Sequence, residues 1–177
     1  MKGLIILLKK IIFLFKRKLR DIFVNSIAAS YFTPLRIRKK IYNIFGIQTF
    51  TKAIRPNCYF GGSNVEIGKG TTINGGCYFE NLERIKIGKN CDIAMEVLFC
   101  TSTHEIGNSE KRAGKAYGDK IIVEDGCWIG ARVTILPGVK VGRGCIIAAN
   151  SVLINDCDEN YMYAGIPAKK IKKLSDL

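Results

Sequence analysis

The chain has a single histidine, His104, among its 177 residues, and its seven cysteines include no Cys-x-x-Cys pair. A zinc centre needs several imidazole or thiolate ligands at close spacing, so both absences argue against a metal site. We expect no metal cofactor.

Acidic residues are scarce at the N-terminal end. Residues 1–52 hold twelve of the 28 Lys and Arg residues but only one of the 15 acids, Asp21. Most of the formal net charge of +13 therefore lies in this segment, and the remainder of the chain is close to neutral. The positive charge of residues 1–52 accordingly indicates little about what the rest of the chain binds.

A long apolar run is also missing near the N-terminus. Within residues 1–25 the longest uncharged run, Gly3–Leu8, is far shorter than the ~20 residues that span a bilayer, and no small-residue cleavage site follows it as in a secretory signal. The apolar residues fall at helical spacing and the basic ones lie away from them, which predicts an amphipathic helix. The apolar stripe is Leu4, Leu8, Ile11, Phe15, Leu19 and Ile22, and the basic side chains that lie away from it include Lys2, Lys9, Lys16 and Arg20.

Two interpretations of this helix are open: peripheral contact of residues 1–25 with an anionic membrane, or packing on the core or on a partner subunit. A second basic stretch, at residues 30–52, predicts a short helix that ends at Gly46. It has no base-reading motif or aromatic platform, so we expect no nucleic-acid partner. Residues 1–52 are thus predicted to form a basic, amphipathic helical region.

The central part of the chain has a strict six-residue period. An aliphatic residue recurs at every sixth position, a hexapeptide repeat that is typical of a parallel β-helix. Three hexads complete one triangular coil, so the repeat predicts about five coils. We therefore predict an all-β fold with residues 53–158 as the β-helix domain. The most regular positions are Val123, Ile129, Ile135, Val141, Ile147 and Leu153.

The repeat is interrupted at three places. The frame slips by two residues around residues 81–84. The period then fails at residues 102–120, where a polar, glycine-containing stretch predicts a loop extruded from the prism; such insertions often lie on the binding face. Finally, residues 164–168 end the repeat, and residues 159–177 are predicted to form a basic tail with a short helix.

Six of the seven cysteines follow the repeat. Each lies four residues after a hexad aliphatic, where other repeats carry Val, Thr or Ser, and a free thiol packs as a small, moderately apolar group. We interpret them as structural thiols in a reducing, cytosolic compartment. They are Cys58, Cys77, Cys91, Cys127, Cys145 and Cys157.

Four short motifs follow one another along the chain: Thr101-Ser-Thr-His104, Gly126-Cys-Trp-Ile-Gly-Ala131, Ile135-Leu-Pro-Gly-Val139 and Ala164-Gly-Ile-Pro-Ala-Lys169. In these motifs the chain resembles the left-handed β-helix acyltransferases, a hexapeptide family that includes galactoside, maltose and nodulation-factor O-acetyltransferases. The resemblance covers residues 54–173. It implies left-handed winding, which the period alone does not determine because most parallel crossovers are right-handed. It also implies acetyl-CoA as co-substrate and a homotrimer with active sites between subunits.

The resemblance assigns the catalytic role to His104. Transfer of an acetyl group from a thioester to an alcohol needs a base that takes the hydroxyl proton, and an imidazole suits that task near neutral pH. The alternative for a lone histidine is a solvated side chain without function. Glu105 is a candidate to orient His104. Arg112 is a candidate to contact the acceptor or a neighbouring chain.

Asn74 matches a family asparagine that binds the acceptor sugar, although a turn between coils explains its Asn-Gly-Gly sequence equally well. The family's acceptor-binding aspartate aligns with residues 81–83, Asn-Leu-Glu, where no aspartate stands. The identity of the acceptor is therefore left open.

Six further residues are candidates for binding CoA. By the resemblance, the tryptophan would lie beside the pantetheine arm, the glycine and alanines would leave room for that arm, and the two lysines would reach the phosphates as point charges. A solvated basic tail is the alternative for the lysines. The six are Trp128, Gly130, Ala131, Ala149, Lys169 and Lys172.

We predict a CoA-dependent O-acetyltransferase that acts on a sugar or glycan precursor in surface-polysaccharide biosynthesis, in the cytoplasm and peripherally at the inner face of the membrane. Two alternatives are a hexapeptide acetyltransferase that modifies an antibiotic and an N-acetyltransferase that acts on an amino sugar. A γ-type carbonic anhydrase on the same fold needs three histidines and is excluded. A non-catalytic scaffold has no need for His104 together with Trp128.

Overall fold

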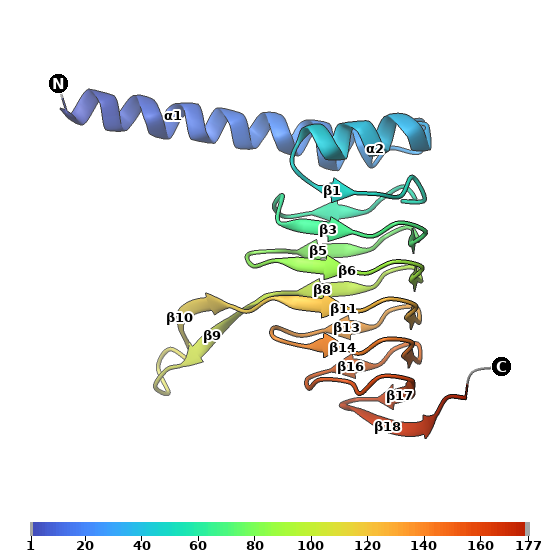
Figure 1. The fold of residues 1–177 in the computed structure, drawn as a ribbon. Coiled ribbons are helices and arrows are strands. Elements are labelled where there is room, and N and C mark those ends of the chain that lie inside the picture. The colour runs from blue at the N-terminus through green and yellow to red at the C-terminus, as the bar shows by residue number, and fades with distance from the viewer. Residues whose placement is uncertain (1, 176–177) are drawn as a thin grey trace.

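The repeat folds into a triangular prism of stacked coils, with helices across one end and a β-hairpin projecting from its side (Figure 1). This computed structural model describes residues 2–175. The last two residues of the predicted tail, Asp176 and Leu177, and the side chains of Lys2 and Leu4 lie outside the described part.

The three faces of the prism are parallel sheets, which we call sheets I, II and III. Sheet I contains β1 (Gln48–Thr49), β3 (Val65–Ile67), β6 (Ile85–Ile87), β11 (Ile121–Val123) and β14 (Lys140–Val141). Sheet II contains β4 (Thr72–Ile73), β7 (Asp92–Ile93), β12 (Trp128–Ile129), β15 (Ile146–Ile147), β17 (Tyr161–Gly165) and, antiparallel to β17, β18 (Ala168–Lys173). Sheet III contains β2 (Tyr59–Phe60), β5 (Tyr78–Glu80), β8 (Leu98–Cys100), β13 (Thr134–Ile135) and β16 (Val152–Leu153). Five parallel strands on each face confirm the predicted five coils.

The period-six residues point into the prism and form its core. All six from Val123 to Leu153 are buried, as the repeat predicts. Along sheet III the inward positions hold a stack of three phenylalanines, with ring centroids 4.6 Å apart between Phe60 and Phe79 and 4.8 Å apart between Phe79 and Phe99. Each buried ring stabilises the fold by roughly 1.5–3 kcal/mol, so this stack is a main link between successive coils.

The cysteine prediction is confirmed, since the six repeat cysteines are free and buried. All but Cys157 have a thiol within hydrogen-bonding distance of a carbonyl group in the next coil; for example, Cys127 Sγ lies 3.1 Å from the carbonyl oxygen of Gly142. The seventh, Cys100, lies outside that position and is half-buried.

The segment predicted as a loop is an ordered β-hairpin. β9 (Ser102–Ile106) pairs antiparallel with β10 (Ala113–Gly118), with His104 opposite Ala116. The hairpin leaves the prism between β8 of sheet III and β11 of sheet I, so it projects from the corner between these two sheets (Figure 1).

The prediction of a short helix in the C-terminal tail is wrong. After β17 the chain turns back through Gly165 and Pro167, and β18 pairs antiparallel with β17 along its whole length. The lysine-rich segment has good helix formers, but the open edge of sheet II offers it backbone hydrogen bonds, and this tertiary pairing outweighs local propensity. The prism therefore extends beyond the predicted boundary at residue 158.

The N-terminal region forms a helical cap on the first coil. It consists of α1 (Lys2–Asp21), a π-helix η1 (Ile22–Ala28) and α2 (Leu35–Ile44), with Gly46 in a left-handed conformation just after α2. Both predicted helices are confirmed. The cap is not separate from the prism, because β1, which lies within the predicted residues 1–52, pairs with β3 of the prism.

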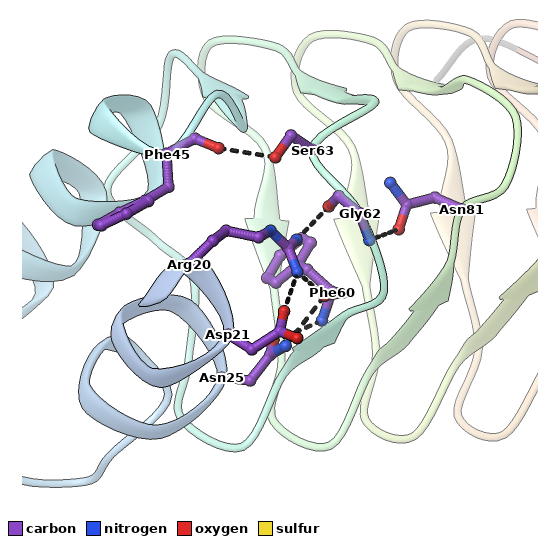
Figure 2. Close-up of polar contacts among 8 residues, drawn as sticks. All are labelled: Arg20, Asp21, Asn25, Phe45, Phe60, Gly62, Ser63 and Asn81. Atoms are coloured by element: carbon purple, nitrogen blue, oxygen red, sulfur yellow. Dashed lines mark hydrogen bonds and ion pairs between the residues drawn. The ribbon is translucent and has the colours of Figure 1, made fainter. Parts of the chain in front are cut away.

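Two buried arginines attach the cap to the prism. Arg38 donates hydrogen bonds to the carbonyls of Ala28 at 2.6 Å and Ile54 at 2.7 Å, and also to those of Ser30 and Thr33. Arg20 donates to the carbonyls of Phe60 and Gly62 (Figure 2). Satisfied backbone acceptors make the burial of these cations tolerable.

No helix in residues 2–175 is long and apolar enough to cross a membrane.

Candidate active site

His104 lies on the projecting hairpin, and its side chain is exposed. In the described part of the chain its imidazole makes no hydrogen bond to another residue, so both ring nitrogens are accessible to a ligand. Successive side chains of a strand point to opposite faces, so Glu105 points away from His104 within one chain. Glu105 is therefore poorly placed for its predicted orienting role.

Arg112 lies near the tip of the hairpin. Its Nη1 donates to the carbonyl of Gly107 at 3.2 Å, and the Gly107 N–H donates back to the Arg112 carbonyl at 2.9 Å. These bonds close the hairpin turn and leave most of the exposed guanidinium accessible to a ligand or a neighbouring chain.

The base of the hairpin is held by Glu80, a residue that the repeat pattern did not single out. Its carboxylate accepts hydrogen bonds from the backbone N–H groups of Thr101 and Ser102, each 3.1 Å long. Thr101 is buried, and its hydroxyl accepts a 3.0 Å bond from the Glu83 N–H. The strand that carries His104 therefore leaves the prism from a fixed point.

Asn74 lies at the corner between sheets II and III. Its backbone N–H and its side-chain Nδ2 both donate to the carbonyl of Ile93, at 2.9 and 3.0 Å. The side chain thus has a structural role in joining two coils. Its amide oxygen makes no hydrogen bond in residues 2–175, so that atom is available to a ligand.

The same corner continues along the prism as a column of small residues. Ala94 N–H donates to the Ile129 carbonyl and Gly130 N–H to the Ile147 carbonyl, each bond linking one coil to the next. Asn74 is therefore one coil away from Ala94 and two from Gly130 on this corner.

An apolar groove of about 470 Å³ runs beside Trp128 on this corner. Its volume lies in the range of small-ligand sites. The indole is 57% exposed, unusual for so large an apolar ring. Five of the six predicted CoA residues meet here: Trp128, Gly130, Ala131, Ala149 and Lys172. The lining also includes Met162 of β17 and Leu174, which directly follows β18; the sequence did not predict either residue.

Gly130 has a structural reason to be glycine. A Cβ there would lie 2.5 Å from the backbone nitrogen of Ala149 in the next coil, closer than packed atoms allow. Its small size therefore serves coil packing as well as the groove.

The predicted phosphate-binding lysines lie on β18. Lys172 lines the groove, whereas Lys169 is exposed outside it. Between them Lys170 forms an ion pair with Asp158 and lies 4.3 Å from the centre of the Tyr161 ring. The hydrogen bond to Asp158 raises the pKa of Lys170. Lys170 is thus committed to contacts within the chain, unlike its two neighbours.

A second hollow, of about 530 Å³, lies on sheet I and holds none of the predicted residues. Two of its charged side chains, Lys140 and Glu124, form a 2.8 Å ion pair.

Within one chain the two halves of the candidate site are on different corners. The hairpin with His104 leaves the corner between sheets III and I, whereas Asn74 and the Trp128 groove occupy the corner between sheets II and III. His104 is not among the residues that line the groove.

The repeats define the class of protein. Residues 120–155 match the model of the family described as bacterial transferase hexapeptide (six repeats). A galactoside O-acetyltransferase of Lactococcus lactis is 30% identical over 144 residues, which are 80% of this chain and 68% of that protein. The chain therefore belongs to the hexapeptide-repeat acetyltransferases.

Two further comparisons agree with this family assignment. A Schizosaccharomyces pombe protein named as an acetyltransferase is 36% identical over 121 residues, 68% of this chain; the chain spans 58% of that relative's length. A galactoside acetyltransferase solved in complex with coenzyme A superposes with a TM-score of 0.78 at 26% identity, covering 92% of this chain and 80% of that one. The predicted left-handed β-helix and the resemblance are confirmed. The predicted class, an acetyl-CoA-dependent acyltransferase, is confirmed as that of the family.

Proposed function

We propose that this protein transfers an acetyl group from acetyl-CoA to a hydroxyl group of a sugar or glycan acceptor. The observation that carries the proposal is the convergence of five predicted CoA residues on one apolar groove. The relatives support the acceptor class, since one is named a galactoside O-acetyltransferase.

The groove fits the donor chemically. Trp128 and Met162 offer apolar surface to the pantetheine arm, and the small residues Ala131 and Ala149 admit it without a steric clash. Lys172 lies at the same groove as a cation for a phosphate group. Lys169, exposed on the same strand, is the second candidate.

In the proposed reaction, His104 takes the proton from the acceptor hydroxyl while the oxygen attacks the thioester carbonyl. The tetrahedral intermediate then collapses, the bond between carbon and sulfur breaks, and the imidazolium returns the proton to the CoA thiolate. The enzyme forms no covalent intermediate, so it need only hold the two substrates in line. The amide oxygen of Asn74 is the proposed acceptor for a sugar hydroxyl.

The two-corner arrangement supports a site shared between chains. We propose a homotrimer in which His104 of one chain faces the corner with Asn74 and the Trp128 groove of its neighbour. A closed ring of three brings different corners of identical subunits together, as heterologous contacts do. Arg112, near the hairpin tip, would then contact the acceptor or the adjacent chain.

The proposal is tested by following thiol release from acetyl-CoA with a panel of sugars, sugar nucleotides, amino sugars and chloramphenicol. Turnover with a sugar and a product ester that mild alkali cleaves would support O-acetylation. An alkali-stable amide product would indicate N-acetylation, and turnover with chloramphenicol alone would indicate a drug-modifying enzyme; either result would overturn the proposed acceptor.

A further inference from the structure

The N-terminal helix has two parts with different surroundings. From Arg20 onward the cap packs on the first coil, whereas the preceding turns of α1 extend past the prism, and residues 5–19 are exposed (Figure 1). On this projecting part four members of the apolar stripe are exposed: Leu8 by 49%, Ile11 by 52%, Phe15 by 66% and Leu19 by 39%. Such a continuous exposed apolar stripe is uncommon on a protein that stays in water.

The contacts of Arg20 determine which way the stripe faces. Arg20 is 9% exposed and donates a 2.8 Å hydrogen bond to the Phe60 carbonyl, while Asn25 exchanges bonds of 2.9 and 3.0 Å with the backbone of the same residue (Figure 2). Residues turn by about 100° each around an α-helix. The face of Arg20 and Lys16 is therefore turned to the prism, and the face of Phe15 and Leu19 is turned away from it.

Basic side chains border the stripe. The projecting turns carry Lys9, Lys10, Lys16, Arg17 and Lys18. The one acid of residues 1–52, Asp21, is paired with Arg20 at 2.7 Å.

The second helix contributes to the same end of the molecule. Arg36 and Lys40 of α2 are exposed, and so are Ile37 by 51% and Ile44 by 68%. The cap thus combines exposed apolar side chains with strong positive charge over both helices.

We propose that this cap docks on an anionic lipid surface, with the stripe of α1 inserted at the interface and the lysines at the level of the headgroups. An apolar face bordered by Lys and Arg is the arrangement by which interfacial helices bind acidic membranes. A second copy of the chain fits less well, because pairing two stripes would bring two such basic helices together. The proposal goes beyond the proposed function and does not depend on it.

Docking would orient the rest of the molecule. Helix α1 crosses one end of the prism and β18 lies at the other (Figure 1). A membrane bound by α1 would therefore leave β18 pointing away from the bilayer, and the hairpin with His104 would project from the side of the prism between them.

The test is flotation of the intact chain with vesicles of phosphatidylcholine, with and without phosphatidylglycerol. We expect binding only to the anionic vesicles, with binding weakened by salt. The double variant I11D/F15D should bind at least about tenfold more weakly, since it removes two apolar anchors. Its control is Ile154→Asp, which changes an isoleucine of similar exposure, 46%, far from the cap.

A second pair of variants isolates the charge. K9Q/K16Q should also weaken binding about tenfold or more, whereas K86Q/K89Q, on exposed lysines of the prism, should not. Point changes are preferable to deleting residues 1–30, because that deletion would remove Arg20 and Val24 and expose the core.

Failure of the native chain to float, or equal flotation of native and I11D/F15D protein, would overturn the proposal. The proposal would also be overturned if light scattering showed that I11D/F15D loses an oligomer that the native chain forms, and the native chain did not bind vesicles. That result would assign the stripe to contact with a second copy of the chain. Binding is measured without substrates, so the outcome is independent of catalysis.

Discussion

Glu80 and Ser102 are joined by a 3.1 Å hydrogen bond from the Ser102 backbone N–H to the Glu80 carboxylate. Ser102 is the first residue of β9, and His104 lies two residues further on, so the two side chains share a face of the strand. Glu80 itself belongs to β5 in the body of the prism. The carboxylate therefore links the position of the imidazole to the rigid core.

Glu80 is accordingly expected to act as a positioning residue. Replacing it by alanine frees the start of β9, and because a displacement of about 1 Å can cost 10²-fold in rate, we expect kcat to fall about tenfold or more. The KM for acetyl-CoA should stay unchanged, because the groove is on another corner. Glu80→Gln, which keeps an acceptor oxygen, should restore most of the activity. If Glu80→Ala matches the control Glu159→Ala, at an exposed site in the last coil, in steady-state kinetics, this role is contradicted.

Trp128 and its neighbour Ile129 offer a test that separates binding from stability. Trp128 is 57% exposed, whereas Ile129 is fully buried. Trp128→Ala should weaken acetyl-CoA binding about tenfold or more by removing aromatic contact area, without changing the thermal midpoint. Ile129→Ala should instead lower the free energy of unfolding by about 2–5 kcal/mol. Calorimetric titration measures acetyl-CoA binding, and denaturant unfolding measures stability. If neither variant binds acetyl-CoA more weakly, the groove is not the donor site.

The buried thiol of Cys157 predicts loss of stability at alkaline pH. Burial raises the pKa of Cys157 from 9.0 to about 12. Between these values the unfolded chain releases the thiol proton while the folded chain retains it, so stability is complete below pH 9 and declines as the pH rises towards 12. Cys157→Val should make this decline shallower in denaturant titrations. An identical pH profile for the native and variant chains would contradict the assignment.

The prism could be predicted from the sequence because one physical rule repeats along it. Each coil buries an aliphatic residue at the same position, so Ile129 and Ile135 indicate their own burial by spacing alone. The cysteines were predictable for the same reason. The groove residues could be predicted only from the family motifs, since Trp128 fits the repeat and nothing in the period singles it out.

Long-range pairing could not be predicted in the same way. The lysine-rich β18 becomes a strand because the edge of sheet II is open beside it, and nothing local in residues 168–173 encodes that edge. Glu80 was missed because its partners, the N–H groups of Thr101 and Ser102, are about twenty residues away and belong to the backbone. Likewise, nothing in the sequence indicates that Arg38 of α2 is buried.

The two-corner arrangement predicts complementation between inactive chains. His104→Ala removes the base, and Ala149→Trp, at an exposed position of the groove, should block the donor site. Each variant alone should be inactive, but their co-expression should restore activity, because some shared sites then receive a native hairpin and a native groove. Mixtures that stay as inactive as the separate variants would indicate a site within one chain.

The most direct test of acetyl transfer by His104 is the turnover of His104→Ala with acetyl-CoA and the sugar acceptor identified by the panel. We expect kcat to fall by about 10²–10⁴-fold, the range for loss of a general base, while acetyl-CoA binding by calorimetry stays within about twofold of the native chain, since His104 is not among the residues that line the groove. Turnover equal to that of the native chain would contradict the proposed mechanism.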